Sequence, residues 1–148
     1  MTEHLARAVT ALDRGTGGLQ MLMDLGNARF VADQPVAMGG LNLGPTPHEI
    51  AAAALAACTT QTLRLYAQRK GWILGETQVE VISKTDSAST PSETFERRIS
   101  LDGSLDNDQK ARLLEIADNC PIHRLLIRGA SITTLLEDAR FSHGTDLG

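Results

Sequence analysis

The chain has 148 residues, of which 42% are hydrophobic and 22% are charged, a size and balance that suit one domain with one core. No biased tract interrupts it, which excludes collagen-like, fibrous and disordered proteins. The net charge of -4 and the aromatic content of 3% exclude the basic or stacking surfaces that nucleic acid requires. We therefore expect a single globular domain over residues 1–148, with no nucleic-acid partner.

The first fifteen residues carry charges where a secretory signal would have its apolar segment, so we expect a cytoplasmic protein. Its two cysteines, Cys58 and Cys120, are 62 positions apart and form no C-x-x-C motif. In a reducing compartment such cysteines are either unpaired packing residues or working thiols. The four histidines have no metal-ligand spacing, and we expect neither a metal nor a cofactor.

Strand-like alternation marks the N-terminal part of the sequence. Apolar residues alternate around residues 6–12 and again at 19–23, and a glycine-rich break at 15–18 separates the two runs. This pattern predicts a β-hairpin, and a short third strand fits residues 28–32. Residues 33–45 are rich in Gly and Pro without any period, which is typical of a loop and allows it to line a site.

A long helix is predicted to begin at Thr46, which serves as N-cap, with Pro47 at the first helical position and Glu49 completing a capping box. It should end at Gly71, about 37 Å further on. The uncharged run at 50–58 should be buried nearly all round, yet it is too short to span a membrane. One domain offers too little cover for such a run, so we predict an obligate homodimer.

The second half of the sequence predicts strands at 78–85 and 94–101, joined by a polar loop. Asp106 and Gln109 form a second capping box, which starts an amphipathic helix that runs to about Asn119. Cys120 then precedes Pro121 as an N-cap precedes an N1 proline, which predicts a short helix through residues 123–127. A last strand is expected at 131–136. This order favours an α+β fold, with an antiparallel sheet packed on a long central helix.

The surroundings of the two cysteines differ. Cys58 ends the alanine-rich run, where a small packing residue and a reactive thiol are about equally expected. Cys120 lies at a helix N-terminus, whose free amides and positive dipole end stabilise a thiolate, and His123 and Arg124 follow it. If the two sulfurs meet, a sulfenic acid formed on one can be resolved by the other as a disulfide, which is thiol-peroxidase chemistry.

Several motifs together resemble the OsmC/Ohr family of osmotically induced and organic hydroperoxide resistance proteins. They are Gly39-Gly40, GPTPHEI at residues 44–50, the alanine run that ends at Cys58, and NCPIH at residues 119–123. The resemblance covers nearly the whole chain. It implies an OsmC-like intertwined homodimer with two sites at the subunit interface.

The resemblance also implies the roles of the thiols. Cys58 would be the peroxidatic cysteine and Cys120 the resolving one, acting on organic hydroperoxides with a dithiol reductant of the lipoyl type, without metal or flavin. The family's peroxidatic branches place a glutamate ten residues before the helix cysteine and pair it with an arginine. Here that position is His48, and Glu49 follows it, so both are candidate catalytic residues. Along one straight helix His48 lies about 15 Å from Cys58.

No arginine stands in register with the family pattern. Arg14 and Arg29 are the nearest cations in the N-terminal part, and Arg64 falls on the opposite side of the helix from Cys58. The leading hypothesis is therefore a cysteine-based peroxidase whose thiolate has lost its expected partner. The alternatives are a non-catalytic dimer that binds an apolar small molecule or a protein partner, and an enzyme of general thiol-disulfide exchange.

Overall fold

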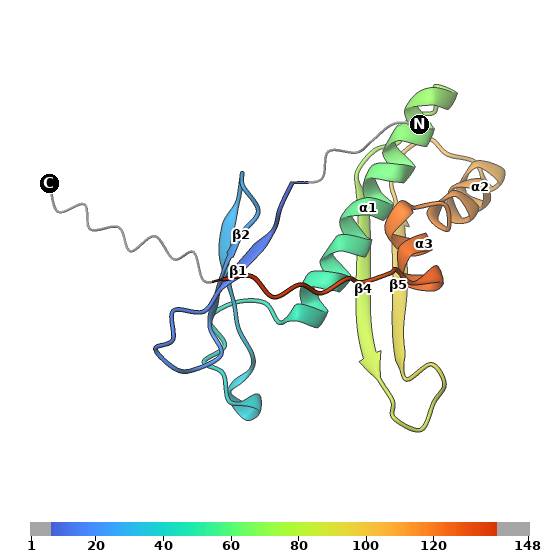
Figure 1. The fold of residues 1–148 in the computed structure, drawn as a ribbon. Helices are drawn as coiled ribbons and strands as arrows, with labels where there is room; N and C mark the ends of the chain where they lie inside the picture. The colour runs from blue at the N-terminus through green and yellow to red at the C-terminus, as the bar shows by residue number, and fades with distance from the viewer. Residues whose placement is uncertain (1–6, 139–148) are drawn as a thin grey trace, which may run out of the picture.

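The computed structural model describes residues 7–138, and its elements fall into two groups (Figure 1). The N-terminal group is a three-stranded antiparallel sheet, and in the second group helix α1 packs on a β-hairpin with two shorter helices beside it. The predicted α+β fold, with antiparallel strands on a long helix, is confirmed. The elements in chain order are β1 (Thr10–Leu12), β2 (Met21–Asp24), β3 (Arg29–Ala32), a 3-10 turn (Val36–Met38), α1 (Pro47–Lys70), β4 (Thr77–Thr85), β5 (Glu93–Leu101), α2 (Asn107–Ala117) and α3 (Pro121–Arg128).

The N-terminal sheet has the order β1-β2-β3, as the alternation predicts. The loop after β3 folds around one buried carboxylate, that of Asp33, which is 2% exposed. Asp33 accepts hydrogen bonds from the backbone N–H groups of Gln34, Leu41 and Leu43 and from the side-chain amide of Gln20. These bonds hold the loop. Burial is the largest single influence on the Asp33 carboxyl and raises its pKa, but the four hydrogen bonds together outweigh it, so the pKa of Asp33 is lowered.

Helix α1 begins and ends where the sequence predicts. Thr46 Oγ1 accepts from the Glu49 N–H at 3.1 Å, and Gly71 closes the helix with a φ of 68°. The predicted capping box is only half formed, because the Glu49 carboxylate accepts from the Thr46 hydroxyl rather than from the Thr46 N–H. None of the helices described has the length and apolar character needed to cross a bilayer.

One stripe of α1 is buried within the chain. Leu55, Thr59 and Leu63 lie on it at four-residue spacing, facing β4, α2 and α3. Residues 53, 54 and 57 are exposed alanines on other sides of the helix. The expectation that residues 50–58 are buried nearly all round is therefore wrong for the single chain, because one hairpin and two short helices cover only part of the circumference.

The β4–β5 hairpin pairs in register from Thr77 opposite Leu101 to Thr85 opposite Glu93, which matches the two predicted strands. Helix α2 starts with the predicted capping box, and both of its bonds are formed. The hydrophobic core is formed by residues from α1, α2 and the segment between α1 and β4. They are Leu63, Ala67, Leu74, Leu113, Ile116 and Ala117.

Residues 131–136 form no strand, so this prediction is wrong for the single chain. The segment is exposed throughout, with Ile132 at 87% and Leu136 at 102% of full exposure. A strand requires a neighbouring edge to complete its hydrogen bonds, and this segment pairs with neither described sheet.

Candidate functional site: two thiols and a buried arginine

Two thiols from separate helices meet where α1 and α3 pack together. Cys58 lies near the middle of α1, and Cys120 is the N-cap of α3. The two thiols are close enough for each to influence the pKa of the other. Cys120 is fully buried and Cys58 is half-buried, so Cys58 is the thiol that solvent can reach. The structure thus brings together the two cysteines that the sequence singles out.

The first turn of α3 directs its amide groups at these sulfurs. The Ile122 amide lowers the pKa of both Cys58 and Cys120, and the His123 amide lowers the pKa of Cys120, although the Cys120 side chain forms no capping hydrogen bond with the helix. Pro121 has no N–H, which leaves the next two amides to act on the thiols. Free amides at a helix N-terminus stabilise negative charge, so this position favours one thiolate.

The two thiols differ in pKa. Burial, and then the adjacent Cys120 thiol, raises the pKa of Cys58 against the opposing effects of the Ile122 amide and the Thr62 hydroxyl. Burial is also the largest single influence on Cys120, but hydrogen bonds from Cys58, from the α3 amides and from Thr59 together lower its pKa. A negative charge is therefore more stable on Cys120 than on Cys58.

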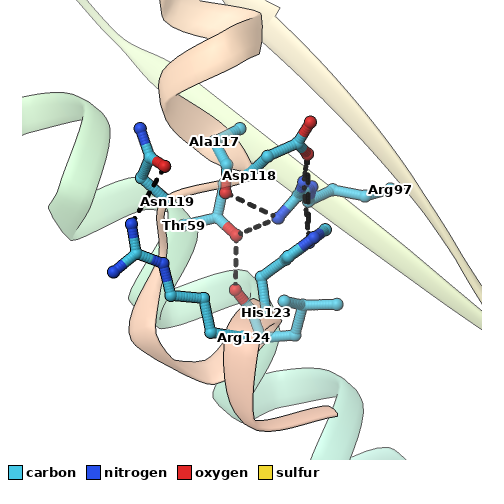
Figure 2. A network of polar contacts seen from close by, with 8 residues as sticks. Thr59, Arg97, Ala117, Asp118, Asn119, His123 and Arg124 are labelled. Atoms are coloured by element: carbon cyan, nitrogen blue, oxygen red, sulfur yellow. Dashed lines mark hydrogen bonds and ion pairs between the residues drawn. The ribbon is translucent and has the colours of Figure 1, made fainter. Parts of the chain in front are cut away.

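A nearly buried arginine contacts residues that flank the two cysteines in the sequence. Arg97 comes from β5, and only 13% of its side chain is exposed. As Figure 2 shows, Nη1 donates to Thr59 Oγ1 at 3.0 Å and to the Ala117 carbonyl at 3.2 Å, while Nη2 donates to Asp118 Oδ1 at 2.9 Å. His123 Nδ1 lies 3.4 Å from Nη2. The guanidinium thus connects α1, the end of α2 and α3.

Sequence reasoning missed Arg97, although the sequence contains its signal. Phe95, Arg97 and Ile99 share the partly buried face of β5, so a charged residue occupies an inward position of an alternating strand. The arginines considered from the sequence are engaged elsewhere. Arg29 pairs with Asp24, and Arg64 donates to backbone carbonyls just after α1.

An apolar groove of about 630 Å³ opens next to Arg97 and His123. It runs between α1, the start of β5 and α3, and its apolar lining includes Leu55, Phe95 and Leu126. The sulfur atoms do not line it. The groove can therefore accept an apolar molecule, with Arg97 and His123 as polar side chains in its lining.

His48 and Glu49 lie at the N-terminal end of α1, ten and nine residues before Cys58. His48 Nε2 is 3.6 Å from the Glu93 carboxylate, and its side chain is 63% exposed. Glu49 bonds with Thr46 as described above. The single chain does not bring either residue to the thiols, since the rise along the helix separates them by about 15 Å. A catalytic role for either one stays a prediction that requires a second subunit.

Ligands for a metal are not gathered at this site. Within residues 7–138, no group of three His, Cys, Asp or Glu side chains is placed to hold a metal ion. The chemistry available to the described residues is that of two sulfurs, the amides of α3, a hydroxyl and a guanidinium.

These features define a class of protein: an α+β chain with a long helix on an antiparallel hairpin and two cysteines close together at a helix N-terminus. Residues 39–135, more than half of the chain, match the protein-family model described as OsmC-like protein. The chain belongs to this OsmC-like family. A search of curated proteins gave no match.

Solved structures show the same fold. An organic hydroperoxide resistance protein from Elizabethkingia anophelis is 24% identical, with a TM-score of 0.65 over 87% of this chain and 92% of that one. An organic hydroperoxide resistance protein OsmC from Legionella pneumophila is 20% identical, with a TM-score of 0.60 over 86% and 93%. An OsmC like protein from Mycoplasma pneumoniae is 18% identical, with a TM-score of 0.63 over 86% and 89%.

Proposed function

We propose that this chain is a cysteine-based peroxidase that reduces organic hydroperoxides through Cys58, with Cys120 as the resolving thiol. The observation that carries the proposal is that the two thiols lie close enough at the N-terminus of α3 to influence each other's pKa, with Cys58 half-buried and Cys120 buried. The names of the Elizabethkingia and Legionella proteins support the substrate class.

The proposed reaction balances over two steps. Cys58 transfers its proton to the Cys120 thiolate, and its sulfur attacks the distal oxygen of the hydroperoxide, which breaks the O–O bond and releases the alcohol once the alkoxide takes up a proton. The Cys58 sulfenic acid then reacts with the Cys120 thiol, which forms the disulfide and releases water. An external dithiol, such as a lipoyl group, reduces the disulfide by exchange and is itself oxidised to a cyclic disulfide.

The groove supports an apolar substrate rather than hydrogen peroxide. Leu55, Phe95 and Leu126 offer apolar contact to an alkyl or aryl group, and Arg97 and His123 also line the groove. Burial of such a group is favourable by about 25 cal/mol per Å² of apolar surface, and hydrogen peroxide has none to bury.

The same proposal includes a homodimer in the cytoplasm. The exposed alanines of α1 and the exposed apolar segment at 131–136 are surfaces that a second copy can cover, and an extended segment can complete its hydrogen bonds on a partner's sheet edge. His48 or Glu49 would then have a route to the partner's thiols. Sedimentation velocity tests this part: a dimer at micromolar concentration is expected, and a monomer would contradict it.

The test of function uses the full chain with cumene hydroperoxide and dihydrolipoic acid. The wild type is expected to consume the peroxide and to show a Cys58–Cys120 disulfide by mass when the reductant is withheld. Cys58→Ser should lose consumption altogether. Cys120→Ser should react once and stop, leaving a sulfenic acid on Cys58 that dimedone traps.

A different outcome would favour the second candidate function, a non-catalytic dimer that binds an apolar small molecule. The observation in its favour is that the groove is complete without either sulfur. Folded wild type that leaves the peroxide untouched and keeps both thiols, while binding an apolar fluorescent dye in the groove, would overturn the peroxidase proposal. Reaction with a small disulfide but not with peroxide would indicate general thiol-disulfide exchange instead.

A further inference from the structure

The thiolate of this site needs a positive partner, and the described residues offer one that the family pattern does not assign. We propose that Arg97 is the positioning residue on which the reactive thiol pair depends, and that it acts through the hydroxyl of Thr59. This inference rests on the proposed function for its importance in the reaction, but its own test needs no peroxide.

Burial makes Arg97 a fixed partner rather than a solvated one. It stands in β5 opposite Val81, and its guanidinium donates to three acceptors, one on α1 and two at the end of α2. A planar guanidinium with two engaged nitrogens is held in one orientation, which a lysine at the same place would not reproduce. Nη1 is the nitrogen that donates to Thr59, the residue that follows Cys58 on α1.

The Thr59 side chain is fully buried. Its oxygen accepts from Arg97 at 3.0 Å, and its hydroxyl donates to the Leu55 carbonyl at 2.7 Å. Thr59 follows Cys58 on α1, and its hydroxyl is one of the groups that lower the pKa of Cys120. A hydroxyl has one proton and two lone pairs. Because Arg97 can only donate, it occupies a lone pair and leaves the Thr59 proton free to turn from Leu55 to the sulfur when Cys120 becomes a thiolate.

Arg97 also polarises this hydroxyl. A donor that is itself hydrogen-bonded to a cation becomes a better donor, particularly where little water competes. Arg97 therefore stabilises the Cys120 thiolate through Thr59, and the thiolate in turn accepts the proton of Cys58. The arrangement supplies what the absent family arginine would supply, from a different strand and through an intermediate residue.

Other charged groups face the same site and define the background of the test. Asp118 pairs with Arg97 from the end of α2, but its side chain is 66% exposed and therefore partly screened by water. His123 faces Arg97 from α3, and Arg124 is turned to the Asn119 side chain. The α1 residues in contact are uncharged.

The experiment measures the rate of iodoacetamide labelling at each cysteine as a function of pH, resolved by peptide mass. Arg97→Gln is expected to raise the pH at which labelling begins by about one unit. At pH 7 this corresponds to a roughly tenfold slower reaction. Thr59→Val should shift it in the same direction, whereas Thr59→Ser keeps the hydroxyl and should retain the wild-type profile. Arg98→Gln, on the exposed face of the same strand, is the matched control and should change nothing.

The double variant decides whether Arg97 acts through Thr59. If it does, Arg97→Gln combined with Thr59→Val shifts the profile no further than Thr59→Val alone, whereas additive shifts would overturn the relay. An unchanged profile in folded Arg97→Gln overturns the proposal outright. If Arg97→Gln fails to fold, as judged by circular dichroism, the contrast between Thr59→Val and Thr59→Ser decides in its place, since equal profiles would overturn it.

The two proposals fail separately. If Arg97→Gln shifts the labelling profile but the wild type does not consume peroxide, this inference stands and the peroxidase proposal is refuted. A wild type that consumes peroxide, together with a labelling profile that Arg97→Gln and Thr59→Val leave unchanged, would refute this inference alone.

Discussion

The N-terminal sheet and the part of the molecule built on α1 are held together by different means. In the α1 part, buried leucines from α1 and α2 form a continuous core, and this core holds α1, the helix that carries Cys58, against α2. In the N-terminal part every residue of β1 and β2 remains at least partly exposed, and the most buried side chain is a carboxylate, Asp33. The comparison shows that apolar packing holds the part of the molecule that contains the candidate site, whereas hydrogen bonds to a buried carboxylate shape the loop that leads into α1.

The strongest test of this comparison removes apolar volume from each part. Leu63 is fully buried in the core, whereas Leu22 in β2 is partly exposed. Leu63→Ala is expected to lower the free energy of unfolding by about 2–5 kcal/mol, and Leu22→Ala by clearly less. Urea denaturation of both variants at one protein concentration measures the difference. Equal losses would mean that β2 is packed as tightly as α1, as it would be if a partner subunit covered the sheet.

A second test probes backbone crowding in the loop. An alanine Cβ at Gly44 would overlap the Val31 carbonyl, although Gly44 has no positive φ, whereas Gly17 has a φ of 84° and open space around it. Gly44→Ala should force the loop away from β3 at a cost of about 1–3 kcal/mol. Hydrogen exchange of the Asp33 amide, which donates to the Pro45 carbonyl, should become faster in Gly44→Ala and stay unchanged in Gly17→Ala. Unchanged protection in both would contradict this account of the loop.

The smallest expected effect concerns pH. Because the pKa of Asp33 is lowered in the folded chain, its contribution to loop stability is present above the unfolded value of about 3.9 and is lost as the pH falls through the lower folded value. The Leu41 and Leu43 amides should therefore stay protected down to below pH 4 in the wild type. Asp33→Asn should expose them at every pH, as amide exchange by NMR would show. Loss of protection well above pH 4 in the wild type would be inconsistent with the assigned bonds.

Much of the fold could be predicted because its elements are marked by local chemistry. Thr46, Pro47 and Gly71 mark α1, and Asp106 with Gln109 marks the start of α2, through groups only a few residues apart. The segment at 131–136 could not be resolved in the same way. Its alternation is compatible with a strand, but strand formation depends on an edge elsewhere, which periodicity does not reveal.

The candidate site, too, could be predicted only where residues close in the sequence mark it. Cys58 and Cys120 could be singled out because a thiol is rare in this sequence and a helix N-terminus can be read from Pro121. Arg97 could not, since its partners Thr59, Ala117 and Asp118 come from other elements and meet only in the folded chain. The half-formed capping box at Thr46 was not predictable either, because the Glu49 carboxylate accepts from the Thr46 hydroxyl rather than from the Thr46 amide.

The position of the two sulfurs along the chain has a further thermal consequence. A covalent link between Cys58 and Cys120 would close a loop of 62 residues that contains β4, β5 and α2. By the loss of chain entropy in the unfolded state, such a closure is worth about 4 kcal/mol. The protein with this link should then melt several degrees above the reduced protein.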